Sequence, residues 1–262
     1  MTQTGEGFGP LLRNFLRMKR TLCLLALELL AAGCGGETAG VVQSTGTTAA
    51  PPTTTAATTA EETQSLELFF LAQDGKLVAA SRDVARTQTP GAETLQELTE
   101  PVEGTTTSVR DGLQLTIDAG KANVTGASLD DAALAQIVYS LTSFPTVQSV
   151  NGKTRADVED FAPAILVEDP SPGEAVTSPM RVTGTANTFE ATFTYRLEDA
   201  QGNELAKDFV TATSGSGTRG TFDFTVPFTV DSAQDGKLVV FELSAEDGSV
   251  IHEREIPLRL VP

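Results

Sequence analysis

The chain has few of the residues on which most active sites depend. Its 262 residues include no tryptophan, two tyrosines, two cysteines and one histidine, His252. A zinc site needs several Cys or His ligands, and a nucleophile–histidine pair needs an orienting partner, so neither kind of site is expected. We therefore predict a protein that is not an enzyme, with no catalytic residue, no metal and no cofactor. His252 is expected to be an exposed residue of a strand.

Basic residues are also scarce relative to acidic ones. The formal net charge is −17, and without the first 33 residues 14 basic residues remain against 33 acidic ones, or −19. Such a surface repels nucleic-acid phosphates and anionic lipid headgroups. We therefore expect no nucleic acid among the partners of this protein.

The N-terminal segment has the three parts of an export signal. A basic stretch that ends at Arg20 precedes an apolar run from Thr21 to Leu30, and small residues follow it. The run is much shorter than the ~20 residues of a membrane-spanning helix. Because Cys34 comes next, we predict that residues 1–34 are a lipoprotein signal peptide and that Cys34 carries the lipid. An ordinary secretory signal is the alternative, and the true start is Met1 or Met18.

Lipidation of Cys34 would place the chain on the outer face of a bacterial cell membrane. More than one acyl chain on Cys34 would give stable anchoring. Cys23 would be removed with the signal, so no disulfide is expected. Residues 35–64 are mostly Thr, Ala, Gly, Ser and Pro, which predicts a disordered spacer. The Thr-rich tracts are also candidate O-glycosylation sites.

Residues 65–158 have the pattern of a small α+β domain, the first domain. A short apolar run predicts a strand over 66–71, and alternating apolar and polar residues predict one over 113–117. Further strands are expected over 76–82, 121–126 and 147–150. Apolar residues spaced by three and four predict a short helix over 91–99 and a longer one before Pro145. The longer helix is expected to start at Ser128, with Asp131 completing a capping box. Both helices should lie against one face of a small sheet.

Residues 163–262, the second domain, contain no helical segment and predict an all-β, immunoglobulin-like sandwich. Strands are expected over residues 165–167, 180–186, 189–197, 205–211, 221–229, 238–244 and 250–260. Apolar and polar residues alternate without exception from Phe189 to Leu197, and Asp235-Gly236 is one of the predicted turns. The sandwich lacks a Cys–Trp–Cys set, which excludes an antibody-type domain.

Both domains resemble known families. The run from Ala133 to Pro145, with Val147, Val150 and Asn151-Gly152 after it, resembles the end of a GerM-type (GerMN) domain. In the second domain, Pro170-Ser171-Pro172-Gly173, Ser178-Pro179 and the run from Val182 to Ala191 resemble the immunoglobulin-like domain of bacterial spore germination. The second family often accompanies a GerM-type domain in exported proteins, so each resemblance supports the other.

The resemblance implies a role in assembly, because related α+β domains build envelope complexes, including ring-like ones during sporulation. We therefore expect a non-enzymatic lipoprotein that is held at the membrane through Cys34 and interacts with other envelope proteins. A homo-oligomer formed through the first domain is compatible with this role. The alternative is a module that binds a cell-wall polymer or a small ligand.

Acidic residues gather where the two domains meet: Asp157, Glu159, Asp160, Glu168 and Asp169. Their spacing does not match an EF-hand loop, and a glycosidase would need two carboxylates across a cleft. We therefore expect these residues to form a solvated hinge.

Overall fold

The computed structural model describes residues 62–262. The predicted signal peptide, Cys34 and nearly all of the predicted spacer lie outside the described residues. No helix within residues 62–262 has the length and apolar character needed to cross a bilayer.

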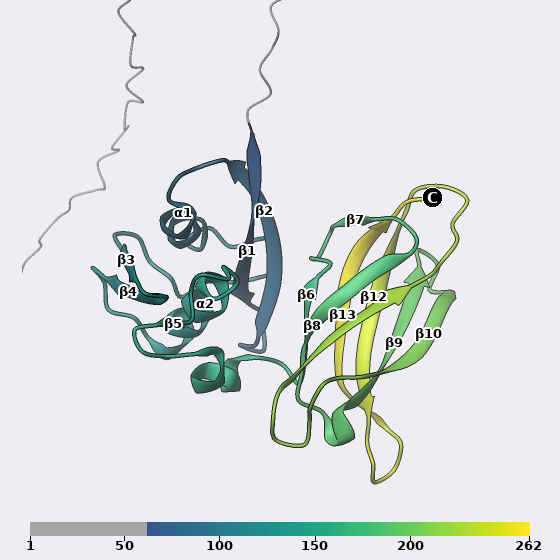
Figure 1. The fold of residues 1–262 in the computed structure, drawn as a ribbon. Coiled ribbons are helices and arrows are strands. Elements are labelled where there is room, and N and C mark those ends of the chain that lie inside the picture. The colour runs from purple at the N-terminus through teal and green to yellow at the C-terminus, as the bar shows by residue number, and fades with distance from the viewer. Residues whose placement is uncertain (1–61) are drawn as a thin grey trace, which may run out of the picture. The chain divides into compact units, whose positions relative to one another are not determined.

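Two helices and many short strands make up the described part of the chain (Figure 1). The first domain contains β1 (Thr63–Leu71), β2 (Leu77–Ala85), α1 (Pro90–Glu97), β3 (Gln114–Asp118), β4 (Lys121–Thr125), α2 (Asp131–Leu141) and β5 (Ser149–Val150). A 3-10 helix, η1 (Arg155–Phe161), follows. The second domain contains β6 (Ile165–Asp169), β7 (Ala175–Val176), β8 (Met180–Ala186), η2 (Phe189–Ala191), β9 (Thr192–Asp199), β10 (Glu204–Thr211), β11 (Gly220–Val226), β12 (Gln234–Leu243) and β13 (Val250–Leu260).

Strand β1 is buried on both faces. Leu68 and Phe70 point to one face and Phe69 and Leu71 to the other, since alternate residues of a strand point in opposite directions, and all four are buried. This explains why the segment is apolar throughout. The predicted hairpin is confirmed, because β1 pairs antiparallel with β2 across a turn in which Gly75 has a φ of 77°.

Helix α2 covers the free edge of β1 with two polar side chains. Gln136 and Ser140 lie one turn apart on the helix, and both are fully buried. Ser140 Oγ accepts a bond from Phe69 N at 3.0 Å, and Gln136 Nε2 donates to Phe69 O at 3.0 Å. Gln136 Oε1 also accepts from Ser108 N at 2.8 Å. The helix thus bonds backbone groups on the edge of β1 that a third strand would otherwise occupy.

The remaining strands of the first domain form a second sheet, so the expected single small sheet is wrong. β1 and β2 form one sheet, and β3, β4 and β5 form the other. Ile117 on the edge strand β3 is 48 % exposed, so its alternation predicted the strand but not its burial.

The predicted start of the long helix is two residues early. Asp130 caps α2, and its carboxylate accepts a bond from Ala133 N at 2.7 Å. Ser128 lies outside the helix. Both residue types cap helices well, and only Asp130 lies three residues before the Ala133 amide.

The second domain is the predicted sandwich. One sheet has the order β10-β9-β12-β13-β7 and the other β11-β8-β6. Their inner faces form one apolar core, in which the rings of Phe193 and Phe222 lie 4.9 Å apart. β8 and β13 have the predicted bounds.

Two predictions for the second domain are wrong. Residues 189–191 form the turn η2 instead of the start of a strand, and Phe189 is 56 % exposed. Asp235-Gly236 lies inside β12 and is not a turn. Gly236 is required by packing, because a Cβ at this position would lie 2.6 Å from both Glu198 O and the Leu260 side chain.

Strand β6 is shared by the cores of both domains. Ile165 and Val167 belong to the core of the sandwich, whereas Leu166 between them belongs to the core of the first domain. β6 accordingly packs against β2 as well as pairing with β8 (Figure 1).

The bonds of Gln136 lead to a first prediction. Gln136→Leu keeps an apolar side chain of similar size but leaves Phe69 O and Ser108 N without partners. We expect unfolding in urea to show a loss of about 2–4 kcal/mol, the cost of leaving one buried and one partly buried backbone group unpaired. Gln96→Leu, at an exposed position of α1, is the control and should change stability by less than about 0.5 kcal/mol. Equal effects of the two substitutions would contradict this role of Gln136.

Candidate functional site

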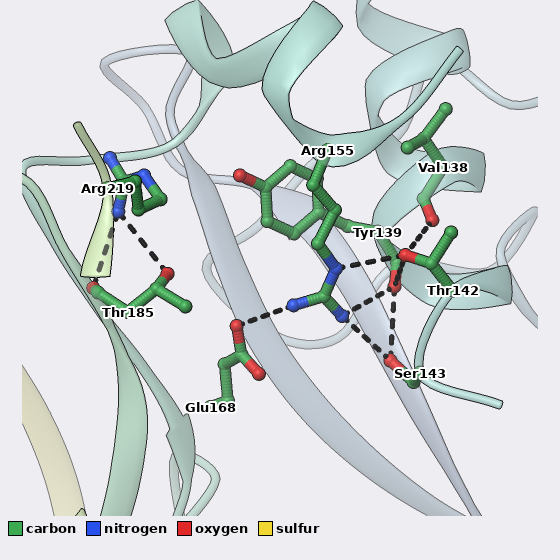
Figure 2. Close-up of polar contacts among 8 residues, drawn as sticks. All are labelled: Val138, Tyr139, Thr142, Ser143, Arg155, Glu168, Thr185 and Arg219. Carbon is green, nitrogen blue, oxygen red and sulfur yellow. Dashed lines mark hydrogen bonds and ion pairs between the residues drawn. The ribbon is translucent and has the colours of Figure 1, made fainter. Parts of the chain in front are cut away.

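The candidate site lies at the junction of the two domains, where η1 passes between α2, β6 and the loop before β11. Figure 2 shows the side chains that meet there. Two arginines, Arg155 and Arg219, form most of its polar contacts.

Arg155 connects the end of α2 to β6. Its Nε donates to Thr142 Oγ1 at 2.9 Å, and its Nη1 donates to Glu168 Oε1 at 2.7 Å (Figure 2). Its Nη2 donates to Tyr139 O at 3.0 Å and to Ser143 Oγ at 3.2 Å. The last turn of α2 contains no basic residue, so Arg155 supplies the positive charge that a helix C-terminus favours.

The guanidinium of Arg155 also lies over two aromatic rings. Its carbon is 4.7 Å from the centre of the Tyr139 ring and 5.4 Å from that of Phe69. The two rings are 5.3 Å apart. Arg155 is therefore fixed by stacking as well as by its hydrogen bonds, a role that the flat guanidinium fills better than a lysine would.

Arg219 makes the second connection across the junction. Its Nε donates to Glu159 Oε1 of η1 at 3.1 Å, and its Nη2 donates to Pro163 O at 2.8 Å. Its Nη1 lies 3.3 Å from Thr185 O on β8. Asn187 Nδ2 donates to the same Glu159 oxygen at 2.9 Å. The sandwich is thus bonded to η1 by two side chains.

Tyr139 has a buried polar atom without a hydrogen-bond partner in residues 62–262. Its side chain is fully buried, and its hydroxyl bonds to no atom of residues 62–262. Tyr139 lines a pocket of about 410 Å³ together with Arg155, Glu159, Thr185 and Arg219, and with Ala156, Gly217 and Thr218. Burial raises the pKa of Tyr139, so the hydroxyl keeps its proton at neutral pH.

Glu67 of β1 lies close to the same cluster. Burial raises the pKa of its carboxyl, and the negative charge of Glu168 raises it further, against the opposing effect of Arg155. One of its oxygens is buried without a partner in the described structure. The ionised form of Glu67 is therefore unfavourable in the folded protein.

The predicted solvated hinge is wrong for Glu159 and Glu168. Both carboxylates pair with arginines, because η1 and β6 bring them against side chains that lie 60 and 13 residues away in sequence. Asp157 accepts a bond from Thr154 N at 2.8 Å within η1, and Asp160 O accepts from Lys76 Nζ at 2.6 Å. Asp169 lies at the end of β6, beside a different pocket.

His252 is an exposed residue of β13, as predicted. Its Nδ1 lies 2.8 Å from Glu242 Oε2, a carboxylate on the neighbouring strand. Within residues 62–262, no cluster of His, Cys, Asp or Glu has the arrangement of a metal site.

Sequence analysis missed Arg155, Arg219, Tyr139 and Glu67. Arg155 follows the Asn151-Gly152 turn, but Lys153 is a second basic residue of the same segment, so charge alone does not single out Arg155. The other three have no signal in sequence, because their importance depends on contacts between segments far apart in the chain.

The fold and the junction define a class of protein: a small α+β domain joined directly to an immunoglobulin-like sandwich. Family models identify both parts. Residues 67–151 match the family described as sporulation and spore germination, and residues 164–249 match the immunoglobulin-like domain of bacterial spore germination. The chain therefore carries one domain of each family, which confirms the resemblance seen in the sequence. Neither is an enzyme family.

Solved structures give weaker likenesses. The tandem GerMN domains of the sporulation protein GerM from Bacillus subtilis share 14 % identity with a TM-score of 0.31, over 65 % of this chain and 64 % of that one. CopC from Methylosinus trichosporium OB3b shares 17 % identity with a TM-score of 0.24, over 37 % of this chain and 94 % of its own. WR4, an MSP family member of C. elegans, shares 13 % identity with a TM-score of 0.22, over 38 % of this chain and 97 % of its own. No curated protein matches the chain.

The contacts of Arg155 lead to a prediction about stability. Arg155→Ala leaves Glu168 without its donor in a partly buried site and removes one of the donors to the carbonyl of Tyr139. We expect a loss of about 2–4 kcal/mol in urea unfolding. The matched control is Arg181→Ala, which breaks the pair between Arg181 and Asp223. Those side chains are 64 % and 57 % exposed, against 26 % and 19 % for Arg155 and Glu168, so the control should cost about 0–1 kcal/mol. A loss no larger than that of the control would show that Arg155 does not hold the junction.

Glu67 leads to a prediction about pH. Folding raises the pKa of the Glu67 carboxyl above its value of 4.5 in the unfolded chain. Its contribution to stability is therefore fully present at a pH below 4.5 and is lost as the pH rises through the pKa of the folded state. Glu67→Gln removes the charge, so the variant should melt about 2–4 °C above wild type at pH 7, the shift that about 1 kcal/mol gives in a chain of this size. The gain should vanish near pH 4. Glu253→Gln, at an exposed position of β13, should show no such dependence, and a pH-independent effect of Glu67→Gln would refute the explanation.

Proposed function

We propose that the protein is a non-enzymatic envelope lipoprotein whose two domains together bind other exported proteins at the outer face of the membrane. The observation that carries this proposal is the junction. β6 contributes side chains to both cores, and Arg155 and Arg219 connect η1 to both domains. Two domains held in this way present residues from both in one fixed arrangement, which a binding partner can recognise without ordering a hinge first.

The chemistry of the described residues fits a binding role better than a catalytic one. His252 pairs with Glu242, and Glu159 and Glu168 pair with arginines, so these groups already have partners within the fold. The two matched families, which are those of sporulation and spore germination, point in the same direction. Lipidation at Cys34 would hold such a surface close to the membrane while the Thr-rich segment gives it reach.

The test is crosslinking in living cells followed by purification through a C-terminal tag. We expect a discrete set of envelope proteins with the wild-type chain, and a reduced set or none with Cys34→Ala. Cys23→Ala, which changes the other cysteine of the chain, is the control and should behave like wild type. Crosslinking of no envelope protein above background would overturn the binding role. An unchanged set with Cys34→Ala would overturn the need for the lipid.

A further inference from the structure

Two pockets adjoin each other along the domain junction. The pocket beside Tyr139 has a volume of about 410 Å³, and the next has about 520 Å³ and is lined by Lys76, Asn187 and His252, among others. The two share Ala156, Glu159 and Arg219. Each falls within the roughly 300–1,000 Å³ that is typical of sites for small molecules.

The hydroxyl of Tyr139 is the observation that points to a ligand. It is fully buried, it bonds to no atom of residues 62–262, and Figure 2 shows it pointing to the side of the junction where Arg219 lies. A buried hydroxyl without a partner costs roughly 1–3 kcal/mol, which phenylalanine at this position would avoid. A ligand oxygen in the pocket would supply the missing partner.

The neighbouring groups offer both donors and acceptors. Arg219 Nη2 donates one of its two N–H groups to Pro163 O, which leaves the other for a ligand. Glu159 Oε1 accepts from Arg219 and Asn187, whereas Oε2 accepts no bond from the described residues. Thr218 lines the same pocket, and a threonine hydroxyl can either donate or accept a hydrogen bond.

The charges around the pocket balance. Arg155 and Arg219 are matched by Glu168 and Glu159, and the chain as a whole is strongly acidic. A small anion would meet the repulsion of this acidic protein, and a cation would meet two arginines. A neutral molecule that both donates and accepts hydrogen bonds meets neither obstacle.

We propose that the pocket beside Tyr139 binds a neutral carbohydrate. Each sugar hydroxyl can donate to Glu159 and accept from Tyr139 or Arg219, and the adjoining pocket can hold a second residue of an oligosaccharide. Phe69 and Arg155 pack against the Tyr139 ring, so a sugar cannot stack on it. We therefore expect an affinity in the millimolar range. This binding function goes beyond the proposed interaction with proteins and does not depend on it.

The test is a titration of the purified full chain, followed by ¹H–¹⁵N NMR, with glucose, N-acetylglucosamine and the N-acetylglucosamine tetramer. We expect amide shifts at residues 155–159 and 217–219, with the tetramer binding more tightly than the single sugars. Tyr139→Phe should weaken binding about five- to tenfold, as expected for the loss of one hydrogen bond. Tyr195→Phe changes the other tyrosine, which stacks on Phe224 in the sandwich, and should leave binding unchanged.

Three results would overturn the proposal. The first is the absence of amide shifts at tens of millimolar of every sugar, and the second is equal binding by wild type and Tyr139→Phe. The third is a larger response to acetate than to the sugars, which would assign the pocket to an anion. Thermal melting without ligand supplies a separate check, since Tyr139→Phe should be no less stable than wild type. If that variant does not fold, Thr218→Ala, at an exposed position of the same pocket, replaces it and should weaken binding.

Discussion

The fold depends on the burial of β6 on both of its faces. Ile165 and Val167 are buried in the sandwich and Leu166 in the first domain, with exposed fractions of 1 %, 8 % and 2 %. Burial of each such side chain contributes roughly 1.5–3 kcal/mol. Separation of the domains would expose Leu166 together with the part of β2 that packs against β6. The two cores are therefore coupled through one strand, and the other features of the junction follow from this coupling.

The polar contacts of the junction can be understood from that constraint. The strand that buries Leu166 continues into Glu168, which places a carboxylate beside the end of α2 and near Glu67. In a partly buried site an unpaired charge is costly. An ion pair is stable there only where hydrogen bonds satisfy its remaining donors and acceptors. Arg155 meets this requirement, because one guanidinium pairs with Glu168 and also bonds the last turn of α2. Glu67 has no comparable partner, which explains why its charge is unfavourable.

Local patterns in the sequence predicted most of the strands and helices, and contacts between distant segments account for what was missed. Apolar and polar residues alternate in Met180–Ala186, which becomes β8, since this strand has one face in a core. Gly236 was mistaken for a turn residue because its need for space comes from Glu198 and Leu260 on neighbouring strands. Arg219 and Glu159 are 60 residues apart, so no spacing rule could pair them. The same limit hid Tyr139, because the lack of a partner for its buried hydroxyl depends on segments that are far from α2 in the chain.

The Tyr139 hydroxyl separates a structural account of the junction from a functional one. Everything else that this side chain does, which is to pack against Phe69 and to lie under Arg155, requires only a ring. Phenylalanine would provide that ring without a buried polar atom, and replacing an unpaired polar group by an apolar one of the same shape is neutral or stabilising. A junction selected only for rigidity would therefore gain from phenylalanine. A tyrosine that faces a pocket shared by both domains instead has the character of a binding group, for which some stability is given up.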